Sequence, residues 1–146
     1  LDGIVQVSRE KVSLLQILEQ IRRYMLQTLL PSARRVTIHV GGEDVIVSAD
    51  CASSVALVVN ELVQNALKYA FPSGQAGRIG IELHSGRPLC QLTVWDNGVG
   101  FQADRPRPGG AGLELASTIV REKLTGEWSV ESGPGGTRIS FDFLEQ

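Results

Sequence analysis

Three hydrophilic side chains of different chemistry, Glu61, Asn65 and Lys68, recur at helical spacing within an otherwise apolar stretch. At about 100° per residue they fall in one arc beside the apolar stripe, so they lie at the border of the core. The spacings of four and three residues make them neighbours on the helix. A carboxylate, an amide and an ammonium group therefore converge on one place and could hold a ligand together. A solvated helix flank gives the same pattern, so other parts of the chain must distinguish the two interpretations.

A second polar group follows the alternating segment that ends at Trp95. Asp96 stands at the predicted end of this strand and is followed by Asn97, Gly98 and Gly100. Asp-Asn-Gly is a common turn sequence, which is the simpler interpretation. The functional interpretation is that the glycines let a planar ligand approach the backbone closely. The carboxylate would then accept a hydrogen bond from an exocyclic amine of that ligand.

Glycines also open the last predicted helix, in the sequence Gly109-Gly110-Ala111-Gly112-Leu113. The unpaired N–H groups at a helix N-terminus bind anions, and glycines leave these groups uncovered. A glycine cluster is a weak signal by itself. The three groups together supply a metal ligand, an acceptor for a base and a cradle for phosphate. This combination fits a nucleoside triphosphate with Mg²⁺.

The composition is that of one globular domain. Of 146 residues, 42% are hydrophobic and 21% charged, and the formal net charge is -2. This charge argues against nucleic acid as a partner, since general nucleic-acid binders carry a basic surface. No apolar run approaches the ~18 residues of a membrane span and no signal peptide is recognisable, so we expect a soluble cytoplasmic domain without membrane contact. Cys51 and Cys90 lack metal-ligand spacing and are interpreted as small buried residues.

Hydrophobic periodicity predicts the elements that position these groups. Residues 1–11 are interpreted as a linker from a missing N-terminal region, and residues 12–146 as the folded domain. Helical spacing predicts three helices: one from Val12 to Leu29, one with Asp50 as its N-cap that ends before Pro72, and one from about Ala111 to Leu124.

Alternation of apolar and polar residues predicts the strands. They form three expected β-hairpins, over residues 35–47, 79–95 and 128–143. Hairpins separated by helices, without regular strand-helix-strand alternation, predict an α+β fold. We expect a two-layer sandwich with a mixed, mainly antiparallel sheet and helices on one face.

Residues 60–72, Asn-Glu-Leu-Val-Gln-Asn-Ala-Leu-Lys-Tyr-Ala-Phe-Pro, resemble the N box of the Bergerat-fold (GHKL) ATPases, the superfamily of sensor histidine kinases, type II topoisomerases and MutL-like proteins. Residues 96–101 resemble the G1 box of this superfamily, residues 110–113 its G2 box, and residues 135–137 its last turn. The order and spacing agree over about residues 12–143. The first motif and the short lid are most similar to the catalytic domain of bacterial sensor histidine kinases, particularly the HisKA_2/HWE-like group.

The resemblance implies roles for residues at the phosphate end of a bound ATP. Asn65 would hold Mg²⁺ through its amide oxygen, Glu61 would activate the attacking group, and Lys68 would contact phosphate. The residues that would receive the phosphates are Gly110, Gly112 and Leu113.

The resemblance also implies a base-binding end. Asp96 would accept from the adenine amino group, with Thr137 helping through a water, and Tyr69 would lie near the ribose or base. Gly98 and Gly100 would shape the adenine pocket.

Residues 101–110 would be the ATP lid. Within it, Arg105 and Arg107 either reach phosphate or, on the simpler interpretation, are solvated. The chain departs from many histidine kinases at Glu114-Leu115, where those proteins have a second Gly-Leu pair.

The implied function is transfer of the ATP γ-phosphate to a histidine on a separate dimerisation and phosphoacceptor domain of the same parent protein. A response regulator of the two-component system would receive the phosphate indirectly. His39 and His84 lie in strand-like alternation and are not expected to be the acceptor. Two alternatives share the motifs: an anti-sigma-factor-like serine kinase, and a nucleotide-gated protein-binding module.

Overall fold

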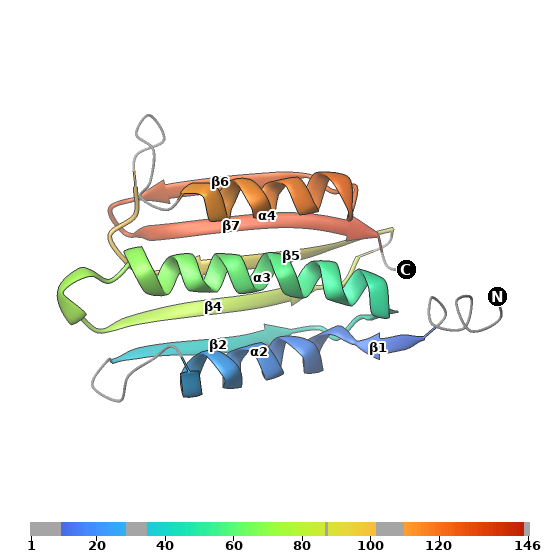
Figure 1. The fold of residues 1–146 in the computed structure, drawn as a ribbon, viewed down its shortest axis with the longest axis horizontal. Coiled ribbons are helices and arrows are strands. Elements are labelled where there is room, and N and C mark those ends of the chain that lie inside the picture. Colours follow the sequence, from blue (N-terminus) through green and yellow to red (C-terminus); the bar gives the residue numbers. More distant parts are fainter. Residues whose placement is uncertain (1–9, 29–34, 87, 102–109, 145–146) are drawn as a thin grey trace.

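The structure is a computed structural model that describes residues 10–28, 35–86, 88–101 and 110–144. Its main feature is a 5-stranded sheet with the strand order β2-β4-β5-β7-β6. The helices lie side by side on one face of this sheet (Figure 1). They are α2 (Leu14–Thr28), α3 (Ala49–Tyr69) and α4 (Gly110–Glu122).

The sheet is mixed, with one parallel pair of strands. β2 runs parallel to β4, while the β4–β5, β5–β7 and β6–β7 pairs are antiparallel. The strands are β2 (Val36–Gly42), β4 (Gly77–His84), β5 (Leu89–Asp96), β6 (Trp128–Gly133) and β7 (Gly136–Leu144). The predicted fold class, an α+β sandwich of one mainly antiparallel sheet and one layer of helices, is confirmed.

Two of the predicted hairpins form, β4–β5 and β6–β7, but the hairpin predicted over residues 35–47 is wrong. The second arm of that hairpin, β3 (Ile46–Ser48), pairs instead with β1 (Lys11–Ser13) in a separate 2-stranded sheet. The residues after the glycine pair serve the start of α2, because Leu14 N donates to Val45 O (3.0 Å) and Leu15 N to the Asp44 carboxylate (3.0 Å). Alternation predicts a strand but not its partner.

The N-cap of helix α3 lies two residues before the predicted one. Ser48 is the N-cap, since its side-chain oxygen accepts from Cys51 N at 3.1 Å. Asp50 lies in the first turn, where a negative charge still favours the helix dipole. The prediction of Asp50 as the cap is therefore wrong. Val12, predicted to begin the first helix, belongs to β1.

The core lies between the helices and the sheet. Val55, Val59 and Leu62 of α3 are at most 2% exposed, and they pack in one apolar cluster with strand residues such as Ile81 and Phe141. Complete burial of one such side chain stabilises the fold by about 1.5–3 kcal/mol. This packing holds the polar edge of α3 at a fixed height above the sheet.

The two cysteines are free and buried. Burial, and secondarily the charge of Cys90, raises the pKa of the Cys51 thiol to about 11. The thiol is therefore protonated at neutral pH and is a poor nucleophile. The interpretation of both cysteines as buried residues is confirmed.

The linker predicted over residues 1–11 lies mostly outside the described residues and stays a prediction. Among the helices of the described ranges, none combines the length and apolarity needed to cross a membrane.

Candidate functional site

The edge of α3 carries the first group of predicted site residues. Asn65 is buried, with 6% of its surface exposed, whereas Glu61 is half-buried and Lys68 is exposed. The side-chain oxygen Oδ1 of Asn65 has no hydrogen-bond partner among the residues that the structure describes. A buried polar atom without a partner costs about 1–3 kcal/mol. Such an atom at the border of the core suggests a site for a ligand.

The start of α4 packs against this edge. A Cβ added to Gly112 would lie 2.9 Å from Asn65 Nδ2 and 2.9 Å from Glu61 Oε2. Only a residue without a side chain leaves these two polar groups undisturbed. Gly112 is in the first turn of α4, where backbone N–H groups lack helical partners. The structure therefore brings together an amide, a carboxylate and a helix N-terminus from two distant parts of the sequence.

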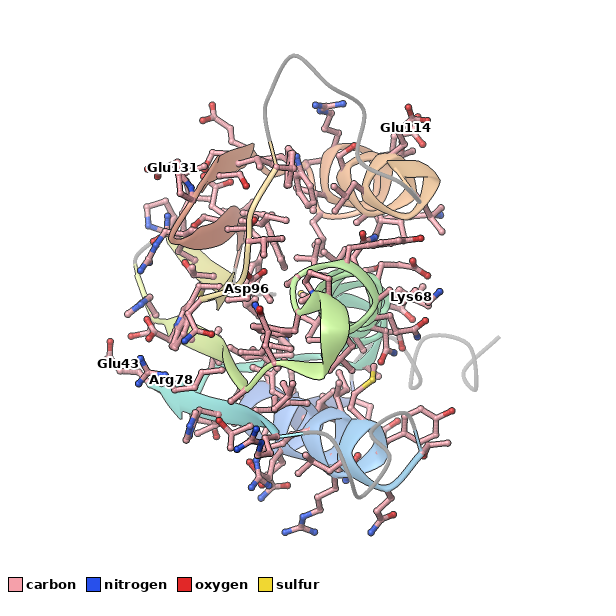
Figure 2. The ribbon with its side chains drawn as sticks, turned by 90° about the vertical axis from the view of Figure 1, so that its left-hand side faces the viewer. Glu43, Lys68, Arg78, Asp96, Glu114 and Glu131 are labelled. Carbon is pink, nitrogen blue, oxygen red and sulfur yellow. The ribbon has the colours of Figure 1, made fainter. Side chains whose placement is uncertain are left out.

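Lys68 does not join this group directly. It extends from the solvent side of α3, whereas Asp96 lies on the side of the helix that faces the sheet (Figure 2). Tyr69 is the last residue of α3 and is half-buried, and Leu113 is half-buried in α4. Arg105 and Arg107 lie outside the described residues, as does most of the predicted lid.

Asp96 ends β5 and is buried, with 8% of its surface exposed. Its Oδ1 accepts from Gly98 N at 2.9 Å, so the turn interpretation of Asp-Asn-Gly is correct. Asn97 ties the same loop to β4, because its Oδ1 accepts from Arg78 N at 2.7 Å and its N donates to Arg78 O at 3.2 Å. The turn and a ligand-binding role are compatible, since the turn fixes the direction of a buried carboxylate.

The glycines of this loop are required by close contacts on both sides. A Cβ on Gly98 would overlap the carbonyl group of Ala70, which also accepts from Val99 N at 2.9 Å. Gly100 has a φ of 70°, a conformation that L side chains rarely adopt, and packs against the carbonyl of Gly133. The loop is thus wedged between the end of α3 and the β6–β7 turn.

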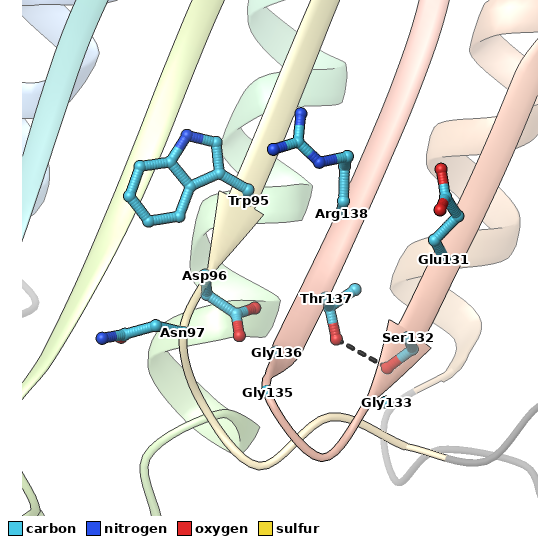
Figure 3. A pocket seen from close by; sticks show the side chains of 10 residues that line it. All are labelled: Trp95, Asp96, Asn97, Glu131, Ser132, Gly133, Gly135, Gly136, Thr137 and Arg138. Carbon is cyan, nitrogen blue, oxygen red and sulfur yellow. Dashed lines mark hydrogen bonds between the residues drawn. The ribbon is translucent and has the colours of Figure 1, made fainter.

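Thr137 lies directly opposite Asp96 in the β5–β7 pair and is also buried. Its hydroxyl lies 2.8 Å from the hydroxyl of Ser132, its cross-strand neighbour on β6 (Figure 3). Ser132 in turn accepts from Phe101 N at 2.8 Å. Ser132 belongs to none of the motifs recognised in the sequence. Pairing the two strands of the last predicted hairpin outward from its glycine turn would have placed Ser132 opposite Thr137.

A hollow of about 470 Å³ opens at this end of the sheet (Figure 3). Asp96 and Thr137 line it, whereas Glu61 and Asn65 do not. Much of its wall comes from the strand face opposite the helices, where Trp95, Arg138 and Glu131 are register partners. The buried polar groups near α3, and not this hollow alone, therefore define the candidate site.

A mixed sheet covered on one face by helices, with polar groups at the end of a strand and at a glycine-opened helix, is the arrangement of the GHKL ATPase fold. Residues 51–146 match the family described as histidine kinase-, DNA gyrase B-, and HSP90-like ATPase, and the chain belongs to this family. The predicted resemblance to the GHKL superfamily is confirmed.

The relatives with this domain are named as histidine kinases or sensor proteins. The chain is 27% identical over 128 residues to sensor histidine kinase PdtaS of Mycobacterium tuberculosis, covering 86% of this chain and 25% of PdtaS. It is 36% identical over 116 residues to the swarming motility regulation sensor protein RssA of Serratia marcescens, covering 69% and 24%. The chain thus spans about a quarter of the length of these curated relatives.

Solved structures agree on the fold. The histidine kinase domain of a blue-light activated histidine kinase from Erythrobacter litoralis matches with a TM-score of 0.80 at 24% identity, covering 92% of this chain and 62% of that one. The family and the relatives together identify this chain as an enzyme domain, the ATPase domain of the histidine kinase type.

Proposed function

We propose that the chain is the ATP-binding catalytic domain of a sensor histidine kinase, which transfers the γ-phosphate of ATP to a histidine on a separate phosphoacceptor domain of its parent protein. The observation that carries the proposal is the buried Asn65 Oδ1, unpartnered among the described residues. The amide group of Asn65 lies beside Glu61 and the first turn of α4, where a phosphate chain and its cation require ligands of this kind.

The residues of the site fit Mg²⁺ as a cofactor. Mg²⁺ takes oxygen ligands and is usually held by one or two protein groups together with substrate phosphates. Asn65 Oδ1 is a neutral oxygen of this type, and Gly112 leaves space beside the Nδ2 of the same amide group. When bound, the ion would neutralise charge on the phosphates. The phosphates themselves would bind the open N–H groups of Gly110, Gly112 and Leu113, with Lys68 as a further contact.

Asp96 and Thr137 would bind the adenine at the other end of the nucleotide. A buried carboxylate accepts strongly from an exocyclic amine, because few water molecules compete with that bond. Gly98 and Gly100 would keep side chains away from the base, and Tyr69 would lie at the ribose or base.

Glu61 would act on the attacking group. Phosphoryl transfer requires positioning and charge stabilisation more than covalent chemistry from the protein. We propose that Glu61 accepts the proton of the substrate imidazole as its N–P bond forms and the bond to the ADP oxygen breaks. His39 and His84 are exposed on strands β2 and β4, on the sheet face opposite α3, so neither lies where Glu61 could act on it.

The proposal extends to the partners. The phosphohistidine would pass its phosphate to a response regulator in a two-component system, and the parent would belong to the HisKA_2/HWE-like group. A serine kinase with the same boxes would produce acid-stable phosphate on a partner protein, whereas phosphohistidine is acid-labile. Labelling of the acceptor followed by acid treatment separates these two functions.

The domain should bind Mg²⁺-ATP, and Asn65 should account for the magnesium dependence. We expect chelation of Mg²⁺ with EDTA to weaken ATP binding to the unmutated domain by about tenfold or more. This effect is as large as the loss of one hydrogen bond to a charged group. Asn65→Ala should bind ATP weakly both with and without EDTA. Isothermal titration calorimetry measures both cases. Absence of ATP and ADP binding to the folded, unmutated domain at millimolar nucleotide would contradict the proposed function.

Gly112→Ala should weaken ATP binding without destabilising the domain. The new Cβ would lie 2.9 Å from groups of both Asn65 and Glu61, so at least one of them must move. Alanine within a helix is otherwise favoured over glycine by about 1 kcal/mol, so the melting temperature should not fall. Gly41→Ala is the matched control, since its Cβ meets nothing within 4 Å. Equal ATP affinity for the parent and Gly112→Ala would remove Gly112 from the site.

A further inference from the structure

A short chain of hydrogen bonds links Phe101, in the loop after β5, to Thr137 through Ser132. We propose that Ser132 is a positioning residue that fixes the direction of the Thr137 hydroxyl proton, and thereby sets the preference of the site for adenine over guanine. This inference rests on the proposed function, because it requires a purine nucleotide bound at Asp96.

The direction of the chain follows from which atoms can donate. Phe101 N lies 2.8 Å from Ser132 Oγ, and a backbone N–H can only donate, so the serine oxygen is an acceptor in this bond. Ser132 Oγ also lies 2.8 Å from Thr137 Oγ1 and has no third partner among the described residues. If the serine proton is to be bonded, it must therefore go to the threonine oxygen. Hydrogen bonds that donate in the same direction along a chain polarise and strengthen one another.

The threonine hydroxyl then keeps its own proton for a ligand. Thr137 is 4% exposed and lies opposite Asp96, whose carboxylate is an acceptor when ionised. Directly opposed residues of an antiparallel pair have Cβ atoms about 4.5–5.5 Å apart. The end of the sheet thus presents an acceptor and a donor beside each other.

This pair of groups matches one purine and not the other. Adenine has an exocyclic amine, a donor, next to a ring nitrogen that accepts. Guanine has a carbonyl, an acceptor, next to a ring N–H that donates. Asp96 with a donating Thr137 is complementary to adenine, directly or through one water. If Thr137 were free to turn its hydroxyl, it could accept from guanine instead, and part of the discrimination would be lost.

The test compares the ATP and GTP affinities of four proteins by calorimetry: the parent, Ser132→Ala, Ser132→Thr and Ser140→Ala. We expect Ser132→Ala to lower the ATP-over-GTP preference by about three- to tenfold, the size of one neutral hydrogen bond. Ser132→Thr should restore the preference because it keeps the hydroxyl. Ser140→Ala is the matched control. It removes a similar cross-strand hydroxyl pair, Thr93 with Ser140 at 3.0 Å, on the opposite face of the sheet.

A second measurement separates positioning from a general effect on structure. In a Thr137→Val background, Ser132→Ala should leave the ATP-to-GTP ratio unchanged, because there is no hydroxyl left to orient. Likewise, Ser132→Ala should weaken ATP more than 1-deaza-ATP, which keeps the amine but lacks the neighbouring ring nitrogen. A structural role would weaken both analogues equally and would persist in the Thr137→Val background, and either result overturns the inference.

The outcomes also distinguish this inference from the proposed function. If the folded, unmutated domain binds neither nucleotide, both the proposed function and the role of Ser132 are wrong. If the unmutated domain prefers ATP and Ser132→Ala keeps the same ATP-to-GTP affinity ratio, only the role of Ser132 is wrong. Should Ser132→Ala fail to fold, Ser132→Cys keeps the volume with a weaker donor and acceptor. It should reduce the ratio in the same direction, and an unchanged ratio in that variant contradicts the role of Ser132.

Discussion

Glu61→Gln should lose most phosphoryl transfer while it keeps its affinity for ATP. Glutamine preserves the size of the side chain and its place beside Gly112, but it cannot accept a proton. General-base assistance is typically worth about 10²–10⁴-fold in rate, and we expect a loss within this range. The nucleotide contacts of Asn65 and Asp96 are unchanged, so binding should survive.

The assay supplies the phosphoacceptor segment in cis or in trans and measures the single-turnover rate from labelled ATP. Glu114→Gln is the matched control. Glu114 is exposed on α4, and its substitution removes the same charge from the domain. The 146-residue chain alone should label itself negligibly. Transfer at the parental rate by Glu61→Gln, or acid-labile phosphate on His39 or His84, would contradict this mechanism.

Asp96→Asn should weaken ATP binding by about 1.5–3 kcal/mol, the value of one charge-assisted hydrogen bond. The asparagine keeps a side-chain oxygen for the turn bond from Gly98 N, so the loop should hold its shape. What changes is the second atom of the group, which becomes an NH₂ donor that opposes the exocyclic amine of adenine. The preference for ATP over GTP should therefore fall together with affinity.

Calorimetry with ATP and GTP measures both effects, and the melting temperature reports on folding. Asp142→Asn is the control, because the Asp142 carboxylate also accepts from a backbone N–H, that of Glu127 at 2.7 Å, outside the candidate site. A folded Asp96→Asn variant that binds ATP and discriminates against GTP as well as the parent would leave Asp96 with its turn role only.

The sequence predicts the local features of this fold better than its long-range pairings. The hairpins β4–β5 and β6–β7 join strands that are adjacent in the chain, so alternation and turn residues specify both arms. The parallel partner of β2 is β4, which lies beyond the whole of α3. No local signal in residues 35–47 distinguishes this pairing from a hairpin, and the expected hairpin was wrong for that reason.

The candidate site shows the same division. The spacing of Glu61 and Asn65 predicts that they are neighbours, and the contact of both with Gly112 is consistent with convergence on one site. That Asn65 is buried with an unpartnered oxygen depends on the position of α4, which the spacing does not give. Ser132 was missed because a lone serine in a strand is common. Its importance comes from two partners, Phe101 and Thr137, that only the folded chain brings to it.

The contact between Gly98 and Ala70 limits how the sequence can change over evolution. Gly98 faces a main-chain carbonyl, and every residue type at position 70 carries the same carbonyl. No second substitution at position 70 could make room for a side chain at position 98. Gly80 differs, because a Cβ there would overlap the indole ring of Trp95, which a smaller residue could replace. Positions 80 and 95 are thus free to covary among relatives, whereas position 98 should stay glycine on its own.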